Sequence, residues 1–488
     1  MNVAIRLDRT GGLSGQIYRQ VRDAVLDGRL RRDEALPSSR ELAEQLKVSR
    51  NTVTTAYDRL VAEGYLTSRP GAGTFVNTLS LTEPAVPQLP AGPLTPRALI
   101  QSMPVPPDFG TAPEFDFRVG APDSRLFPFA AWRRLLSDQF RLSAVGTGMP
   151  VEPAGHLGLR TLTARHLRMS RLIETDPRDV LITSGVQQAL DLIGRVLLEP
   201  GATAAVEEPG YAPPGLIWAA QGARVVGVPV DEHGLIVDAL PDDARLVYVT
   251  PSHQYPTGVA LSLRRRMELL AWARRHDAAI VEDDYDSEFR YTEQQLEPLH
   301  SLDRGGRVLY VGSFSKVLLP TLRLGVLLHP PSLRHALHAA KFLTDWHTSL
   351  PVQAAMADFL EQGLFVRHLR RVRRIYRQRH DRIAAALAGP LSAHLTAVPS
   401  AAGLHLSAMV RTTTAAEALI RAQAAGVGVA SFPEIAAAPA DPPGVVFGYG
   451  MIDESRIDEG LVRLQRCLDA DQPGAPGAQP GRVSRPPH

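Results

Sequence analysis

Apolar positions between residues 115 and 470 follow two patterns that alternate along the chain. Short continuous apolar runs predict buried strands, and longer stretches with apolar residues every three or four positions predict helices. Alternating buried strands and crossover helices predict an α/β fold with a mostly parallel sheet covered on both faces. The predicted strands are DVLITS (179–184), TAAVEEP (203–209), ARVVGVPV (223–230), ARLVYVTP (244–251), AAIVEDD (278–284) and RVLYVGS (307–313), with helices at 186–198 and 261–277.

The first 78 residues show a different pattern, with helical periodicity from the start. Residues 14–28 place Ile17, Val21 and Val25 on one face of a helix. Ser38 is followed three residues later by Glu41, a capping box that predicts a helix beginning near Ser39.

A third helix is expected to follow within a few residues. Ser49 is suited to cap it, and its apolar stripe consists of Val53, Ala56, Tyr57 and Leu60. Two short helices joined by a tight turn form a helix-turn-helix. The following YLTSRPGAGTFV (65–76) predicts two strands around a glycine-bearing turn, which is a wing.

The start of the third helix carries side chains that suit DNA. In a helix-turn-helix the N-terminal residues of the second helix reach base edges. Arg50 can bind guanine, Asn51 can bind adenine, and Thr52 can contact phosphate or a thymine methyl group. The alternative is a small helical packing module without a ligand.

Residues 12–77 strongly resemble the winged helix of the GntR family of bacterial regulators, in the order helix, helix, recognition helix and wing. The resemblance implies binding to double-stranded DNA at a promoter operator. It places Arg40, Arg50, Asn51 and Thr52 at contact positions and Gly71 at the wing tip. The candidate DNA-binding residues are Arg40, Ser49, Arg50, Asn51, Thr52 and Gly71.

Residues 79–113 contain nine prolines, which exclude a long helix or a central strand. This composition favours an extended tether, and a proline-rich loop on a domain surface is the alternative. The tail 471–488 is expected to be disordered. The predicted organisation is a winged helix (1–78), a linker (79–114), a large α/β domain (115–470) and the tail.

Composition adds little to this picture. The 488 residues are 44% hydrophobic and 21% charged, which is ordinary for a globular protein. The single cysteine, Cys467, excludes an intrachain disulfide. No apolar run reaches the length of a membrane span, the N-terminus lacks the apolar core of a signal peptide, and a cytoplasmic location is expected. Residues 1–78 hold 12 Lys and Arg against 9 Asp and Glu, a basic excess that permits DNA binding.

The stretch GSFSKVLLPTLRLG (312–325) places Lys316 at the end of a predicted strand. Burial lowers the pKa of a lysine and turns it into a nucleophilic amine. Such a lysine forms a Schiff base with an aldehyde, and pyridoxal 5'-phosphate (PLP) is the commonest aldehyde cofactor. Lys316 is the candidate catalytic residue, and a solvated rim lysine is the alternative.

Donors for the cofactor's phosphate stand near other strand ends. Ser313, Ser315 and Arg323 surround Lys316 in the sequence. Ser184 and Gly185 lie where a strand turns into a helix, a position whose backbone N–H groups favour an anion, and Gln187 can add a side-chain donor.

The pyridine ring needs further partners. A carboxylate keeps its nitrogen protonated, and Asp283 ends a predicted strand. Tyr285 can bond the phenolate oxygen, and Tyr211 can stack on the ring. Taken alone, the EDD run fits a solvated turn or a metal site, and Tyr211 fits turn packing. The order Ser-Gly, Tyr, Asp, Lys, Arg at successive strand ends favours the cofactor, and no metal site is predicted.

Residues 115–469 resemble fold-type I PLP enzymes of the aspartate-aminotransferase group, through SFSK, LRLG and PTG (256–258). A GntR winged helix, a long linker and such a domain resemble the MocR subfamily of GntR regulators, with TPSHQYPTG and EDDYDSEFRY as the most specific stretches. This resemblance implies a domain-swapped homodimer in which each winged helix crosses toward the partner's large domain.

Two departures from the aminotransferase pattern bear on activity. Tyr255 stands before PTG, where an asparagine is usual, so Tyr285, helped by His253 or Gln254, has to serve the phenolate oxygen. Val446 stands near the position of the arginine that holds a substrate carboxylate. His405 is a possible polar lining residue or a structural histidine.

Three functions fit these departures. In the first, PLP is the effector, and the protein senses it and regulates vitamin B6 synthesis. In the second, an amine or amino acid reacting with PLP is the effector. In the third, the chain is an active aminotransferase that carries a DNA-binding domain.

Overall fold

The computed structural model describes residues 5–8, 11–77, 94–103, 112–141, 152–291, 297–400, 402–411, 415–432 and 444–469. The chain divides into two compact units, Met1–Pro96 and Arg97–His488. The boundary falls inside the predicted linker, most of which lies outside the described residues, as does the predicted tail 471–488.

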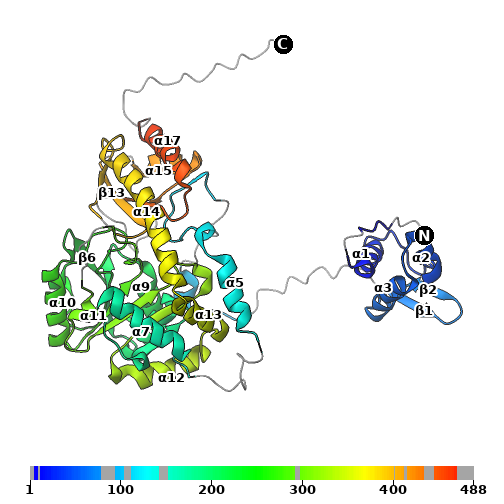
Figure 1. The fold of residues 1–488 in the computed structure, drawn as a ribbon, viewed down its shortest axis with the longest axis horizontal. Helices are drawn as coiled ribbons and strands as arrows, with labels where there is room; N and C mark the ends of the chain where they lie inside the picture. Colours follow the sequence, from blue (N-terminus) through cyan, green and yellow to red (C-terminus); the bar gives the residue numbers. More distant parts are fainter. Residues whose placement is uncertain are drawn as a thin grey trace, which may run out of the picture. The chain divides into compact units, whose positions relative to one another are not determined.

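The N-terminal unit is a winged helix-turn-helix (Figure 1). It contains α1 Leu13–Leu26, α2 Ser39–Leu46, α3 Arg50–Ala62, β1 Leu66–Arg69 and β2 Gly73–Val76. Ser38 and Glu41 form the expected capping box, and the Ser49 side chain accepts the Thr52 N–H. The strands β1 and β2 pair antiparallel. The predicted apolar stripe of α3 is buried against α1.

The centre of the second unit is an eight-stranded, mostly parallel sheet, which confirms the predicted fold class. Its order is β4-β11-β10-β9-β8-β5-β6-β7, and β11 is antiparallel to both neighbours. The strands are β4 Val180–Thr183, β5 Thr203–Glu208, β6 Arg224–Asp231, β7 Gly234–Leu235, β8 Ala244–Val249, β9 Ala279–Asp284, β10 Val308–Ser313 and β11 Gly325–Leu328.

Helices cover both faces of this sheet, as the apolar strand sequences predict. In β9, Ile280 packs in a cluster with α10, whereas the next residue, Val281, packs in a cluster with α8 and α9. The helices of the unit are α4 Ala98–Ser102, α5 Phe129–Asp138, α7 Leu157–Arg171, α8 Val186–Leu197, α9 Ala212–Ala220, α10 Leu263–Arg275, α11 Leu299–Leu302, α12 Arg334–Asp345, α13 Leu350–Glu361, α14 Leu364–Ala388, α15 Ala415–Ala424 and α17 Ile457–Asp469.

A smaller sheet forms the other end of this unit. The long helix α14 runs from the layer beside the large sheet to the part that holds β13, α15 and α17 (Figure 1). The small sheet has the order β12-β13-β16-β15, and β3 pairs with β14 beside it. The strands are β3 Phe115–Asp116, β12 Leu395–Ala397, β13 His405–Val410, β14 Val427–Gly428, β15 Ala430–Ser431 and β16 Gly444–Gly448.

The described end of the predicted linker contains only the five-residue helix α4, and the Arg97 side chain donates to the Ala220 carbonyl at 3.1 Å. Of the helices in the described residues, none is long and apolar enough to cross a membrane.

The direction of the strands determines where the candidate site residues meet. Because β5, β8, β9 and β10 are parallel, the residues that follow them emerge at one edge of the sheet. The strand β11 leads back from that edge between β10 and β4, and it brings Gly325 opposite Thr183. A Cβ atom on Gly325 would lie 2.7 Å from Thr183 Oγ1, so only glycine permits this approach.

A buried ion pair joins α14 to the N-terminal segment of this unit, and its loss should destabilise the fold. Arg379 donates to Asp123 at 2.7 Å and to the Tyr449 and Gly450 carbonyls. We expect Arg379→Ala to cost about 3–5 kcal/mol, because it breaks a buried pair. On the same helix, the exposed Arg382 pairs with Asp458, and Arg382→Ala should cost about 1 kcal/mol or less. Chemical denaturation of the full chain measures both, and equal losses would contradict the assignment.

Candidate functional site

A pocket of about 360 Å³ opens at the carboxyl edge of the large sheet. Eight of the ten predicted cofactor residues line it, although they come from five separate segments of the sequence. The lining residues are Val119, Gly120, Val186, Gln187, Tyr211, Tyr248, Thr250, Tyr255, Asp283, Tyr285, Asp286, Ser313, Ser315, Lys316, Pro320, Arg323, Leu404 and His405.

Lys316 follows β10 and reaches into this pocket. Its Nζ atom donates to the Gly120 carbonyl at 2.6 Å. Burial lowers the pKa of the Lys316 ammonium, while the carboxylates of Asp286 and Asp283 oppose the shift. A lysine of this kind is readily deprotonated and can attack an aldehyde.

Asp283 lies in β9, paired with Val311 of β10. Tyr248 donates to its Oδ2 atom at 2.7 Å, whereas Oδ1 is buried without a partner. Burial raises the pKa of Asp283 to about 7, against the lowering effect of the Tyr248 hydrogen bond. The carboxylate is therefore built to receive a cationic donor from the pocket.

The phosphate-binding candidates form a group at the N-terminus of α8. Arg323 donates to the Ser184 carbonyl at 2.8 Å, and its guanidinium lies against Gly185. Gly185 has φ +83°, and a Cβ atom there would lie 3.0 Å from the Arg323 side chain. Ser313 accepts the Ser315 N–H at 3.0 Å. Gln187 lies on the first turn of α8 and lines the pocket.

Ser184 and Gly185 are the two predicted cofactor residues outside the lining. The Ser184 hydroxyl lies 3.1 Å from Thr348 Oγ1, which accepts a hydrogen bond from the buried Lys341. The structure thus directs the Ser184 side chain away from the pocket and uses its carbonyl to position Arg323. Sequence spacing alone does not show this second polar cluster.

The aromatic candidates follow two different strands of the large sheet, Tyr211 after β5 and Tyr285 after β9. Tyr285 donates to the His253 carbonyl at 2.8 Å, and burial raises the pKa of its hydroxyl well above the usual value. Tyr211 precedes the first residue of α9, and its ring packs edge-on against Tyr255 at 5.9 Å between centroids. Gln254, the other helper suggested by the sequence, donates instead to the Pro209 carbonyl at 2.8 Å.

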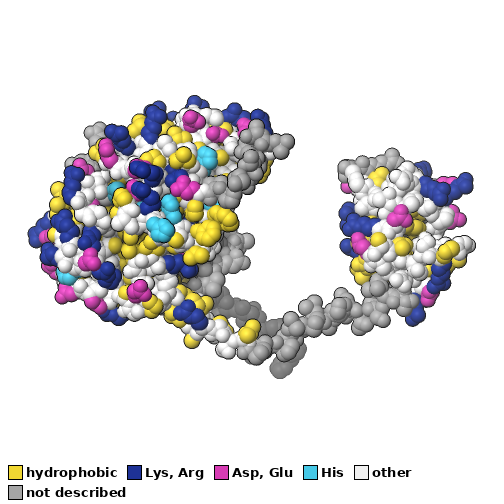
Figure 2. Space-filling view, turned by 90° about the horizontal axis from the view of Figure 1, so that it is seen from below, with side chains coloured by type: hydrophobic (Ala, Val, Ile, Leu, Met, Phe, Trp, Pro, Cys, Tyr) yellow, Lys and Arg dark blue, Asp and Glu magenta, His cyan; other side chains and the backbone are white. Residues whose placement is uncertain are grey.

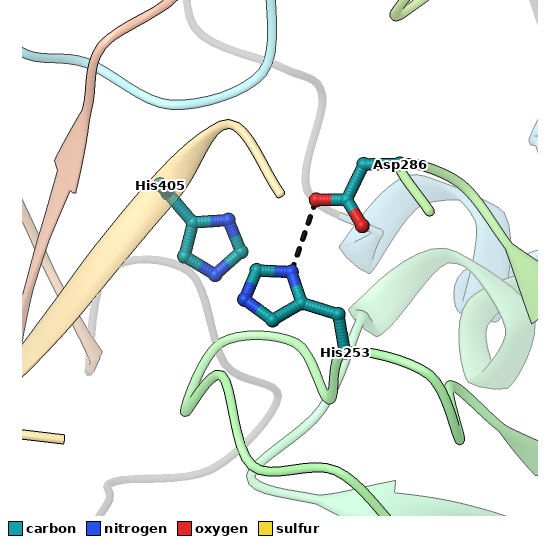
Figure 3. A group of neighbouring side chains, drawn as sticks. All are labelled: His253, Asp286 and His405. Carbon is teal, nitrogen blue, oxygen red and sulfur yellow. Dashed lines mark hydrogen bonds and ion pairs between the residues drawn. The ribbon is translucent and has the colours of Figure 1, made fainter. Parts of the chain in front are cut away.

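His253, Asp286 and His405 form a buried cluster at the pocket (Figure 3). His253 Nδ1 lies 3.0 Å from Asp286 Oδ2, and His253 Nε2 lies 3.0 Å from Ser400 Oγ, so both of its ring nitrogens are engaged. The His405 ring, carried by β13, faces the His253 ring at 4.5 Å between centroids. Within the cluster, His405 Nε2 is buried without a hydrogen-bond partner.

A glycine permits this cluster to form. Gly403 has φ +90°, and a Cβ atom there would lie 2.2 Å from His253 Cε1. Any side chain at position 403 would displace the imidazole.

Val446 lies on β16 and is fully buried. It pairs with Ser407, while His405 pairs with Gly448, so His405, Ser407 and Val446 share one face of the small sheet. The Ser407 hydroxyl donates to the Pro256 carbonyl of the PTG loop, which shows that this face is turned toward the pocket. Apolar Val446, the residue expected near the position of a carboxylate-binding arginine, lies on this face.

The predicted DNA-contact residues lie on the surface of the N-terminal unit. Ser49 caps α3, and Arg50 and Asn51 are exposed at its first turn. Arg50 Nε donates to Ser39 Oγ at 3.4 Å, which leaves the rest of its guanidinium free to bind.

Arg40 on α2 and Gly71 at the wing turn are also exposed. Arg40 lies near Glu44, at 3.7 Å, and Gly71 has φ +75°. Figure 2 shows several Lys and Arg side chains on the surface of this unit, with Asp and Glu side chains among them.

Sequence reasoning missed Tyr248 and Asp286, which both line the pocket. Tyr248 is the fifth residue of β8 and looks like core, because its contact with Asp283 crosses between neighbouring strands. Asp286 follows Asp283 by three residues, and a second acidic position after a strand end was a usable signal.

Two known protein families match this chain, one on each side of the boundary between its two compact units. A family model for bacterial regulatory proteins of the gntR family matches residues 13–76. A family model for aminotransferases of class I and II matches residues 116–437.

Two similar proteins extend over nearly the whole chain. The probable rhizopine catabolism regulatory protein MocR of Rhizobium meliloti is 38% identical, over 93% of this chain and 93% of that protein. The HTH-type pyridoxine biosynthesis transcriptional regulator PdxR of Corynebacterium glutamicum is 33% identical, over 96% of this chain and 98% of that protein.

A solved structure resembles the larger unit. It is LysN, an alpha-aminoadipate aminotransferase of Thermus thermophilus, complexed with N-(5'-phosphopyridoxyl)-L-leucine. The match covers 72% of this chain and 92% of LysN, at 30% identity and a TM-score of 0.66.

Fold, pocket and family matches together define a GntR-type winged helix joined to an aminotransferase-like domain of fold type I. The two relatives above are similar over nearly the full length, and not only within one domain, which identifies the subfamily. The chain belongs to the MocR subfamily of GntR-type regulators, which confirms the family inferred from the sequence.

The donor set of the pocket fits PLP. The unpartnered Asp283 oxygen suits a protonated pyridine nitrogen, the Arg323 and α8 N-terminal groups suit a phosphate, and Lys316 suits an aldehyde. The aminotransferase family match supports the same cofactor.

The buried carboxylate of Asp283 should make the stability of the cofactor-free protein depend on pH. Because folding raises its pKa from 3.8 to about 7, the charged form destabilises the fold increasingly from pH 4 to 7 and constantly above. We expect Asp283→Asn to stabilise the cofactor-free protein at pH 8 by on the order of 4 kcal/mol and to have little effect at pH 4. Denaturation curves across this range measure the difference. The exposed Asp238→Asn is the control, and an equal effect of Asp283→Asn at both pH values would overturn the assignment.

Proposed function

We propose that this protein is a transcriptional regulator that binds PLP in the larger unit and operator DNA through the winged helix. The observation that carries the proposal is the unpartnered, buried oxygen of Asp283 in the same pocket as Lys316 and Arg323. A polar atom left unsatisfied in this way costs free energy unless a ligand completes it. Because the same chain also carries a recognition helix, we infer that binding of this ligand is coupled to DNA binding.

In this proposal Lys316 holds the cofactor covalently, Asp283 holds the pyridine nitrogen and Tyr211 packs on the ring. Tyr285 serves the phenolate oxygen. The phosphate is held by Arg323, Ser313, Ser315, Gln187 and the backbone of Ser184 and Gly185. When bound, PLP supplies an aldehyde that condenses with primary amines.

Regulation fits this chain better than full transamination does. In this proposal Val446 stands in place of the arginine that would clamp a substrate carboxylate. Among the described residues that line the pocket, only Lys316 and Arg323 are cationic. The two relatives that match nearly end to end are named as regulators. Two effectors fit this pocket. One is PLP itself, and the other is an amino compound that reacts with bound PLP.

A ligand can alter DNA binding only if it favours one arrangement of the protein over another. We propose a domain-swapped homodimer that presents two winged helices, with residues 79–114 as the linker between the domains. Such a regulator acts where bacterial DNA lies, so the proposal places the protein in the cytoplasm.

Lys316→Ala should abolish covalent cofactor binding. The chain has three lysines, Lys47, Lys316 and Lys341, so reduction with borohydride followed by peptide mass mapping assigns the adduct. We expect the adduct on Lys316 and loss of visible absorption in the variant, while the exposed Lys47→Ala keeps both. An adduct on Lys341, which pairs with Asp345 at 2.6 Å, would refute the proposed site.

Arg50→Ala should weaken operator binding by about 10- to 100-fold and leave cofactor absorption intact, because one base contact is worth about 1–3 kcal/mol. Gel-shift titration against promoter fragments neighbouring the gene measures the change. Arg29→Ala, an exposed arginine that pairs with Asp27, is the control. Unchanged affinity in Arg50→Ala would remove α3 from the role of recognition helix.

A further inference from the structure

A second cavity, of about 580 Å³, lies in the larger unit, and none of its described lining residues lines the pocket around Lys316. Its walls come from the end of α7, the segment after β9 and the middle of α14. Four of the lining residues are arginines, namely Arg171, Arg290, Arg373 and Arg377, so we call it the arginine cavity. The function proposed above uses none of them.

Two of these arginines are held by the backbone. Arg373 and Arg377 stand about one turn apart on α14, on the same side of the helix. Arg373 Nη2 donates to the Arg290 carbonyl at 2.8 Å, and Arg377 Nη2 donates to the Tyr291 carbonyl at 2.9 Å. A guanidinium has five N–H donors, so Arg373 and Arg377 are anchored and still keep donors for a ligand.

The charges of Arg373 and Arg377 are not balanced by the protein. In the part of the chain that the structure describes, no carboxylate lies within ion-pair distance of either guanidinium. Arg171 differs, because its Nε atom lies 3.2 Å from Asp284 Oδ2 and its Nη2 atom lies 3.8 Å from Glu288 Oε2. The cavity is thus bordered by two cations that lack a counter-ion, which a dianion would supply.

An arginine-rich helix face that is merely solvated is the ordinary explanation of such charges. It suits Arg370, Arg371 and Arg374, which are exposed on α14 and do not line the cavity. Arg373 and Arg377 differ from them, because each is anchored to a carbonyl and borders a hollow whose volume suits a small molecule.

We propose that the arginine cavity binds a small phosphomonoester, with Arg373 and Arg377 as ligands of its phosphate group. Guanidinium groups form strong, charge-assisted hydrogen bonds with phosphate. The arginines come from three elements, and donors from several directions suit a tetrahedral group better than a flat carboxylate. The volume leaves room for an organic part beyond the phosphate. The inference depends neither on PLP nor on DNA.

Glycerol 3-phosphate, inorganic phosphate and glycerol test the proposal. Each is titrated by calorimetry, at constant ionic strength, into the full-length protein loaded with PLP, so that the phosphate site of the cofactor is filled. We expect saturable binding of glycerol 3-phosphate at one site per chain, weaker binding of inorganic phosphate and none of glycerol. Binding of glycerol 3-phosphate that is absent, or no tighter than that of inorganic phosphate, would overturn the proposal.

Variants on α14 locate the site. Arg373→Ala and Arg377→Ala should each weaken the binding of glycerol 3-phosphate by at least about 10-fold, because each removes hydrogen bonds from a charged donor. Arg374→Ala is the matched control, since it removes an exposed arginine from the same helix, and its affinity should stay unchanged. Cofactor absorption serves as the check that all three variants fold. An equal loss in Arg374→Ala would mean that the phosphate is attracted by the general charge of α14, and the cavity would have no role.

Contact with DNA phosphates is the competing explanation. Gel shifts with operator DNA, without added phosphomonoester, should give the same affinity for Arg373→Ala, Arg377→Ala and the unmodified protein. If both variants weaken operator binding while glycerol 3-phosphate does not bind, the arginines belong to a DNA surface and the proposal is wrong. Failure of PLP to attach to Lys316 would instead refute the proposed function alone, because the calorimetric difference between Arg373→Ala and Arg374→Ala does not depend on it.

Discussion

The carboxylate of Asp283 is the constraint on which the large unit depends. It is completely buried within β9, with one oxygen bonded to Tyr248 and the other unpartnered. Such a group is costly in an empty protein and is satisfied when a protonated ring nitrogen arrives. The parallel strands bring Lys316, Tyr211 and Asp286 to the same edge, so one ligand can meet all of these groups.

Much of this arrangement could be predicted from the sequence. Lys316, Asp283 and Arg323 each follow or end a recognisable element, and parallel strands carry such residues to one edge whatever lies between them. Ser49 and the stripe of α3 were equally predictable, since capping and helical periodicity are local. These positions depend on spacing along the chain.

The remaining features depend on contacts between distant residues. Whether the Ser184 hydroxyl enters the pocket is decided by Thr348, 164 residues away. Tyr248 acts through a strand-to-strand hydrogen bond, and His253 is held by Asp286 and Ser400 on other segments. No local pattern encodes these partners. His405 could be named from the sequence as a lining residue, but its packing against His253 needed the fold.

The pocket is lined by residues from both the large sheet and the small sheet. The candidate cofactor groups stand at the strand ends of the large sheet, while His405 lines the pocket from β13 of the small sheet, on the same sheet face as Val446. Gly325 and Gly403 permit close backbone approaches, the first within the large sheet and the second beside His253. Substitutions on β13 and β16 can therefore change the small-sheet side of the pocket, while the candidate cofactor groups at the strand ends of the large sheet stay the same.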